Sequence, residues 1–217
     1  MYNRKTVSTI LVLVLLSSLV FSSTGASSIV RVDVLPLSGE DIGPNAGTTA
    51  YHTYDEMLTE LLQISANYPA ITDLTSIGTT YQGYSIWSMK ISDNAQAEED
   101  EPEVIIYGMH HAREWLTVEV SMYLINFLTG NYSTNSSVQN IVDNREVWII
   151  PMVNPDGRFY DGDDDPAVYT NWRKNRVPNG DGSTGVDLNR NYGHMWGGAG
   201  SSDDPSSEVY RGSGPFS

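Results

Sequence analysis

The sequence has no cysteine, few basic residues and only one long apolar run. Without cysteine, no disulfide framework can stabilise the 217-residue chain, so its stability must come from its core and from any bound metal ions. Only 12 Lys and Arg residues accompany 27 Asp and Glu residues, which gives a net charge of −15. So acidic a chain is a poor partner for phosphates, and we expect no nucleic-acid partner. The hydrophobic fraction, 40%, is ordinary for one globular domain.

The single long apolar run lies at the N-terminus and has the form of a secretory signal. Arg4 and Lys5 precede the apolar stretch Ile10–Phe21, and the small residues after it allow cleavage after Ala26. The stretch is shorter than the roughly 20 residues that span a bilayer. We therefore expect a signal peptide over residues 1–26 and a secreted protein with no stable membrane association after cleavage. An uncleaved anchor is the alternative.

The rest of the chain divides into a leader and one domain. Residues 27–50 are polar and rich in Pro and Gly, which predicts an extended leader, and residues 51–217 form the domain. "TYDE", starting at Thr53, is a capping box, and apolar residues at helical spacing follow it. This pattern predicts an amphipathic helix that ends before Pro69.

Strand signals follow this helix. "ITDLTSIG" and "YSIWSMKI", separated by "TTYQG", predict a hairpin, and the apolar runs 104–108 and 147–154 predict buried central strands. The apolar segment 113–130 between those runs predicts a buried helix. This alternation indicates an α/β fold with a mixed, mainly parallel central sheet and helices on both faces. From Gly162 onward the chain is loop-like, and so long a tract is usually functional.

His110, His111 and Glu114 follow directly on the first central strand. Open α/β sheets bind ligands at this edge, and imidazole together with carboxylate suits zinc. In a helix, His110 and Glu114 are spaced i, i+4, whereas His111 and Glu114 are spaced i, i+3, so the spacing leaves both histidines as candidates. Because catalytic zinc normally has three protein ligands, a helix-start carboxylate beside two ordinary histidines is the alternative.

The scarce basic residues gather in one window of the loop-like tract. Arg173, Lys174, Arg176 and Arg190 lie close together in the sequence. In an acidic protein such a cluster indicates an anion-binding site, and a solvated surface patch is the alternative.

Five stretches in chain order carry a further signal: "GMHHAREW", "NPDG", "NWRKNR", "GVDLNRNY" and "PSSEVYRG". Together they resemble the zinc carboxypeptidases of the carboxypeptidase A type, most of all the bacterial carboxypeptidase T branch, from about Tyr51 to Ser217. The resemblance implies that residues 51–217 are the N-terminal portion of a peptidase domain. It also implies a zinc cofactor, and a peptide or protein substrate whose last residue carries a free carboxylate.

The same resemblance implies roles for single residues on the metal side. His111 and Glu114 match the first two zinc ligands of the family, whereas His110 falls at a variable position. Arg113 matches a residue that lines the cleft and contacts the peptide backbone.

On the substrate side, the resemblance places Arg173 beside the scissile carbonyl, where Zn²⁺ and a guanidinium can stabilise the negative charge that develops on the oxygen. Asn189 and Arg190 match residues that hold the terminal carboxylate. A guanidinium fork suits a carboxylate because it donates two parallel charge-assisted hydrogen bonds.

The sequence departs from the family in its later part. The family carries a third zinc ligand, a His, and a Glu that activates the metal-bound water, but after Glu114 the only histidine is His194, directly after the Asn-Arg-Asn segment. Glu119, Glu146 and Glu208 do not match the general-base position. We therefore expect a domain truncated at its C-terminus, and a chain that alone hydrolyses peptides poorly or not at all. Chelator-sensitive turnover would contradict this prediction.

Three alternatives to a carboxypeptidase fragment remain open. One is a non-catalytic protein that binds peptide C-termini, and another is a decayed gene product. The third is a zinc deacylase that acts on small amides, against which the Asn189–Arg190 pair and "NPDG" argue.

The segment Ser92–Glu103 is an acidic loop. Ca²⁺ takes six to eight oxygen ligands from such loops, and the bacterial branch that the chain resembles is stabilised by calcium. A solvated acidic loop is the alternative. The candidate calcium ligands are Asp93, Glu99, Glu101, Glu103 and Glu146.

Overall fold

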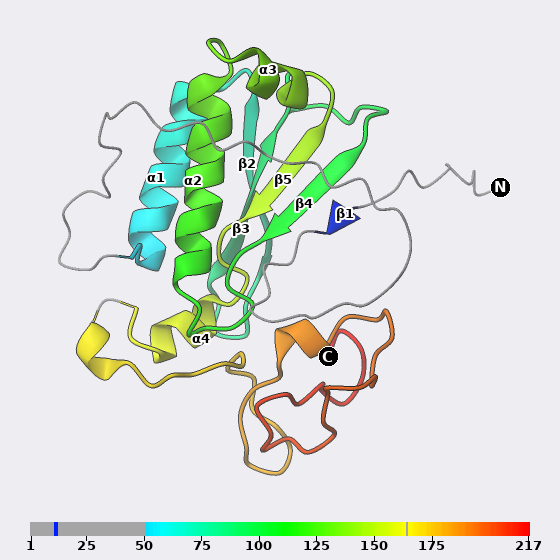
Figure 1. Ribbon diagram of the computed structural model, residues 1–217. Coiled ribbons are helices and arrows are strands. Elements are labelled where there is room, and N and C mark those ends of the chain that lie inside the picture. Colours follow the sequence, from blue (N-terminus) through cyan, green and yellow to red (C-terminus); the bar gives the residue numbers. More distant parts are fainter. Residues whose placement is uncertain (1–10, 13–50, 164) are drawn as a thin grey trace, which may run out of the picture.

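A mixed sheet organises the described part of the chain (Figure 1). The computed structural model describes residues 11–12, 51–163 and 165–217. The strand order is β1-β4-β5-β3-β2. The strands are β1 (Leu11–Val12), β2 (Thr72–Thr79), β3 (Ser85–Ile91), β4 (Glu103–Tyr107) and β5 (Glu146–Ile150).

The pairing confirms a mixed α/β sheet. The β1–β4 and β4–β5 pairs are parallel, whereas β5–β3 and the predicted hairpin β3–β2 are antiparallel. Parallel and antiparallel pairs are therefore equal in number, and the sheet is less parallel than expected. Leu11–Val12 belong to the predicted signal peptide, whose other residues lie outside the described ranges together with the leader 27–50.

Four α-helices and two short 3₁₀ helices accompany these strands in the described residues. They are α1 (Tyr54–Asn67), α2 (Leu116–Asn131), α3 (Ser136–Val142), α4 (Pro155–Tyr160), η1 (Pro166–Val168) and η2 (Leu188–Arg190). The predicted capping box is present, since Thr53 Oγ1 accepts from the Glu56 amide and the Glu56 carboxylate accepts from the Thr53 amide. None of the helices in the described ranges is both long and apolar enough to cross a membrane.

The core lies between the sheet and the two long helices α1 and α2. Because Met89 pairs with Ile149 and Ile91 with Val147, these four side chains share one face of the sheet. That face packs in one buried cluster with residues of both helices, so α1 and α2 cover the same side. We predicted helices on both faces of the sheet. Among the described residues, the two long helices α1 and α2 both cover one face. The helical members of the cluster include Met57, Leu61, Val118, Met122 and Ile125.

The carboxyl ends of β4 and β5 meet at one edge, above α4 and the loops that follow it (Figure 1). β4 leads into the His110–Trp115 loop, and β5 leads into Asn154. The strand predicted over 147–154 ends at Ile150, and the "NPDG" segment begins α4, because Asn154 Oδ1 accepts from the Gly157 amide and Pro155 occupies the first turn. The long tract after Gly162 is loop-like, as expected, and it folds back onto this edge.

Candidate metal and carboxylate site

His111 lies between two carboxylates beyond the end of β4. Its Nδ1 is 2.9 Å from Glu114 Oε1, and its Nε2 is 3.1 Å from Asp187 Oδ1. The His111 side chain is only 3% exposed, whereas Glu114 is partly exposed. A histidine that a carboxylate holds through one ring nitrogen presents the other nitrogen to a metal. The donors that converge here, imidazole Nδ1 and carboxylate Oε1, are of the kind that zinc binds.

The charges around His111 favour its cationic form in the absence of a metal. Burial alone would lower the pKa of His111, but hydrogen bonds to Asp187 and Glu114 raise it above the ordinary value. Burial likewise works to raise the pKa of Glu114, and the hydrogen bond from His111 lowers it on balance. A bound metal cation would replace the proton between His111 and Glu114, so these two side chains suit a metal ion.

His110 has a different environment. Its Nε2 is 2.5 Å from the Tyr192 hydroxyl, and its ring meets Tyr107 edge-on at 5.5 Å between centroids. Burial, and then the neighbouring His111, lower the pKa of His110 to about 4. Of the two candidates that spacing allowed, the structure therefore brings His111 to Glu114 and packs His110 against tyrosines.

Asp187 connects the metal side of the site with the substrate side. Its fully buried carboxylate contacts His111 through Oδ1 and accepts from Arg173 through Oδ2, at 3.0 Å from Nε and 2.8 Å from Nη2. Despite burial, His111 and Arg173 hold the pKa of Asp187 below its ordinary value. Asp187 was not among the residues predicted for the site, although it lies within the segment "GVDLNRNY". The signal that could have identified it is an acidic residue two positions before the predicted substrate contacts Asn189 and Arg190.

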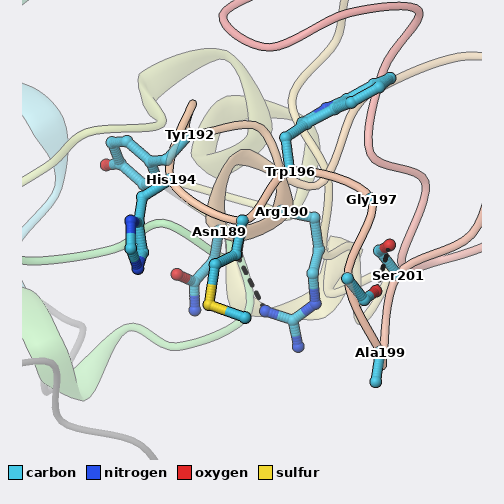
Figure 2. Close-up of a pocket in the computed structure, with 10 residues that line it drawn as sticks. Asn189, Arg190, Tyr192, His194, Trp196, Gly197, Ala199 and Ser201 are labelled. Atoms are coloured by element: carbon cyan, nitrogen blue, oxygen red, sulfur yellow. Dashed lines mark hydrogen bonds between the residues drawn. The ribbon is translucent and has the colours of Figure 1, made fainter.

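Asn189 and Arg190, the last two residues of η2, line a pocket of about 100 Å³ (Figure 2). Arg190 donates from Nη1 to the Asn189 carbonyl at 2.9 Å and from Nε to the Gly200 carbonyl at 3.0 Å. Among the described residues no carboxylate forms an ion pair with Arg190. The other labelled residues of the pocket are Tyr192, His194, Trp196, Gly197, Ala199 and Ser201.

Arg113 points to Glu208 across the loops. The two Nη atoms lie 3.2 and 3.3 Å from the Glu208 carboxylate oxygens, and Nη1 also donates to the Asn171 carbonyl. Glu208 lines a second pocket of about 260 Å³ together with Arg173 and Lys174. The structure thus gathers all the residues singled out on the metal and substrate sides around the edge where β4 and β5 end.

Within the described residues, no third His, Cys, Asp or Glu ligand atom joins His111 and Glu114 in a metal-sized group. The carboxylates considered as general bases are engaged elsewhere. Glu119 contacts His52, Glu146 contacts Lys90 and Glu208 contacts Arg113. The residues present therefore fit one half of a zinc site.

The acidic loop forms two groups of carboxylates, each with its ligand atoms within 4.8 Å of one another. One group joins Glu98 and Glu103 to Glu146, which is fully buried and has an Oε2 atom without a hydrogen-bond partner. Glu146 Oε1 accepts from Lys90 Nζ at 2.7 Å. Glu98 was absent from the expected ligands. The other group is Asp93, Glu99 and Glu101.

Comparison with known proteins points to one family. The family model described as zinc carboxypeptidase matches residues 57–217. A zinc carboxypeptidase from Saccharothrix mutabilis subsp. capreolus is 47% identical over 152 residues, which cover 70% of this chain and 34% of that protein. A metallocarboxypeptidase A from Trichophyton tonsurans is 35% identical over 167 residues, or 76% of this chain and 38% of the relative.

Solved structures agree with this result. The crystal structure of the carboxypeptidase A from Helicoverpa armigera matches with a TM-score of 0.67 at 32% identity, over 77% of this chain and 39% of that one. The chain thus spans between 34% and 39% of the length of these three relatives.

Proposed function

The chain belongs to the zinc carboxypeptidase family, and from this membership we propose that it is part of a secreted metallocarboxypeptidase that removes C-terminal residues from peptides. One observation carries the proposal: the buried carboxylate of Asp187 holds both His111 and Arg173. It thereby fixes a metal-binding nitrogen and a guanidinium beside each other, and hydrolysis of an amide needs both kinds of group close to the carbonyl oxygen.

His111 and Glu114 are the proposed zinc ligands. Zinc bound there would supply a Lewis acid for the scissile carbonyl and its attacking water. Asp187 keeps the His111 ring oriented through Nε2, so that Nδ1 faces Glu114, and these two groups would hold the ion.

The arginines are the proposed substrate contacts. Arg173, held by Asp187, lies where it can stabilise negative charge on the carbonyl oxygen. Arg190 and Asn189 bind the terminal carboxylate in the pocket of about 100 Å³, where only backbone carbonyls among the described groups engage the guanidinium. Arg113 binds the peptide backbone after it leaves Glu208.

Metal binding tests this proposal directly. We expect the purified chain to bind Zn²⁺ or Co²⁺ with one site at His111, measured by titration calorimetry and by the visible spectrum of Co²⁺. His111→Ala should abolish that site, and the matched His110→Gln variant should retain it. Equal loss in both variants, or binding that survives in His111→Ala, would rule out the assignment. Hydrolysis by the chain alone should stay low because two protein ligands and no positioned general base are present in the described residues.

A protein that only binds peptide C-termini is the second candidate. It is favoured by the Arg190 pocket, which needs no metal for its geometry. The two candidates differ in how they respond to chelator. A peptide that binds equally well with and without zinc supports the binding protein, whereas tighter binding with zinc supports the enzyme site.

We also propose that the acidic loop binds Ca²⁺ at Glu98, Glu103 and Glu146. Glu146 supports this, because its buried Oε2 has no hydrogen-bond partner and one of its carboxylate oxygens lies within 4.8 Å of oxygens of Glu98 and Glu103. Saturating Ca²⁺ should raise Tm by about 5 °C or more at a hundredfold excess over Kd. Glu98→Gln/Glu103→Gln should remove the shift, and Asp93→Asn/Glu99→Gln, in the neighbouring group, should leave it. No shift in wild type excludes a site.

Export is proposed from the N-terminal signal alone. The intact mass of protein recovered from the medium of an expressing culture should correspond to a chain that begins at Ser27. Protein that stays cell-associated with residues 1–26 attached would contradict the proposal.

A further inference from the structure

Asn154, at the N-terminal end of α4, joins two loops of the site through one side chain. Its Oδ1 accepts from the Gly157 amide at 3.0 Å, which caps the helix. Its Nδ2 donates to the His110 carbonyl and to the Lys174 carbonyl, both at 3.1 Å. The residue is buried, so neither bond competes with bulk water. One amide group thus ties the residue before His111 to the residue after Arg173.

Asp161, at the C-terminal end of the same helix, makes a second bridge between the same loops. Its Oδ2 accepts from Trp115 Nε1 at 3.1 Å, and Trp115 directly follows Glu114. Its Oδ1 accepts from the Trp172 amide at 2.6 Å, and also from the amide and hydroxyl of Thr170. The Asp161 carboxylate is fully buried, so its four hydrogen bonds replace the water that it has lost.

Between the two bridges, the His110–Trp115 loop and the loop that carries Arg173 are in direct contact. The Ala112 amide, near the middle of the His110–Trp115 loop, donates to the Arg173 carbonyl at 3.1 Å. Gly157 is packed so closely that a Cβ there would lie 2.6 Å from Asn154 Nδ2 and 2.8 Å from the Ala112 Cβ. Helix α4 therefore lies against both loops along its length.

We propose that Asn154 and Asp161 are positioning residues, which act through the two loops to fix the metal pair His111–Glu114 relative to Arg173. This inference rests on the proposed function for its catalytic meaning, since neither residue contacts the pair itself. Asp187 joins His111 and Arg173 directly, whereas Asn154 and Asp161, at the two ends of α4, join the loops that carry them. Because carbonyl polarisation depends on the placement of both groups, an error of about 1 Å between them would cost activity.

Two substitutions cut the bridges while preserving the caps. Asn154→Asp keeps an oxygen for the Gly157 amide and loses both donations from Nδ2. Asp161→Asn can keep its oxygen toward Trp172 and Thr170 while its NH₂ group opposes the Trp115 N–H. Trp115→Phe removes the same bond from the other side if Asp161→Asn fails to fold. Asn135→Asp is the matched control, because Asn135 caps α3 by accepting from the Ser137 and Val138 amides.

The first measurement needs no metal. Hydrogen exchange of the Ala112 amide reports the contact between the loops, and we expect it to accelerate at least tenfold in Asn154→Asp and Asp161→Asn, with no change in Asn135→Asp. The second measurement is Co²⁺ affinity, which should fall by about tenfold with a changed visible spectrum, as for other residues that orient metal ligands.

Each outcome has one meaning. Lower Tm with unchanged Ala112 exchange and unchanged Co²⁺ binding would overturn the inference and leave Asn154 and Asp161 as ordinary structural residues. If wild type binds no Co²⁺, the proposed function fails, and Ala112 exchange still decides whether the bridges set the loop contact.

Discussion

Arg173, which is bound by the residue that caps η2, and Arg190, the last residue of η2, are held in opposite ways. Asp187, a fully buried carboxylate, engages Arg173 through two of its nitrogens. Arg190 meets two backbone carbonyls and, in the described part of the chain, no carboxylate. The charge of Arg173 is balanced by a carboxylate of the protein, whereas the charge of Arg190 is available to an anionic ligand.

The difference separates two tasks that a peptidase needs from a cation. A guanidinium that stabilises the charge developing on a neutral carbonyl oxygen is best fixed in place beforehand, because preorganised groups need no rearrangement during reaction. A guanidinium that recognises a permanent carboxylate gains most from leaving its charge unpaired until the ligand arrives.

The largest effect should come from Asp187→Ala. The substitution leaves the buried His111 and the mostly buried Arg173 without their shared partner, and breaking a buried pair costs about 3–5 kcal/mol. The free energy of unfolding from urea denaturation measures it, with the exposed Asp203→Ala as control. A loss below about 1 kcal/mol would mean that Arg173 is not held as described.

Arg190→Gln should weaken ligand binding and spare stability. Charge-assisted hydrogen bonds contribute about 1.5–3 kcal/mol, so Kd for an N-acetylated dipeptide should rise by roughly 10–100-fold. The same dipeptide with a C-terminal amide is the control ligand, and it should bind wild type and variant alike. Equal weakening by Arg173→Gln for the carboxylate alone would erase the distinction between the two arginines.

His52 is a third cationic side chain held by carboxylates, away from the site, and its charge depends on pH. Hydrogen bonds to Glu119 and then Glu60 raise the pKa of His52 from 6.5 to about 10. A raised folded pKa stabilises the protein fully below pH 6.5, and this stabilisation is lost as pH rises through about 10. Tm measured from pH 6.5 to 10 should therefore fall in wild type and fall less in His52→Gln. Parallel curves would contradict the ion pair, and exposed His194→Gln is the control.

The smallest effect should come from Glu208→Gln. Glu208 is 66% exposed, and exposed ion pairs contribute about 0–1 kcal/mol. We expect unchanged stability within about 0.5 kcal/mol and slightly tighter peptide binding, because Arg113 no longer has to leave a carboxylate. A marked loss of stability would place Arg113 with the held arginine, Arg173, instead of the free one.

Periodicity and capping signals were enough to predict the elements that build the sheet side of the molecule. The capping box at Thr53, the hairpin and both central strands are present, although the second strand ends at Ile150 and not at residue 154. The short helices α3 and α4 were missed because each spans two turns or fewer. At that length caps such as Asn154 decide the conformation, and periodicity has little to work with.

The site was predictable only in its parts. Spacing could not choose between His110 and His111, and the family resemblance pointed to His111, the histidine that the structure brings to Glu114. Asp187 lies 76 residues from His111 in the sequence. Its role depends on a tertiary contact that no local pattern reveals. Glu98 was omitted from the calcium ligands for a similar reason, since only the fold aligns it with Glu146.

Helix α4 carries a constraint on chain length as well as on residue type. Each residue of an α-helix advances the axis by about 1.5 Å and turns it by about 100°. Inserting or deleting one residue within Pro155–Tyr160 would therefore rotate one cap away from its loop while the other stayed in place. The Tyr160 ring packs against Trp172 and Arg176, so this position is constrained in residue type, and the number of residues between Asn154 and Asp161 sets the distance between the two bridges. Relatives should therefore keep the number of residues in this segment constant.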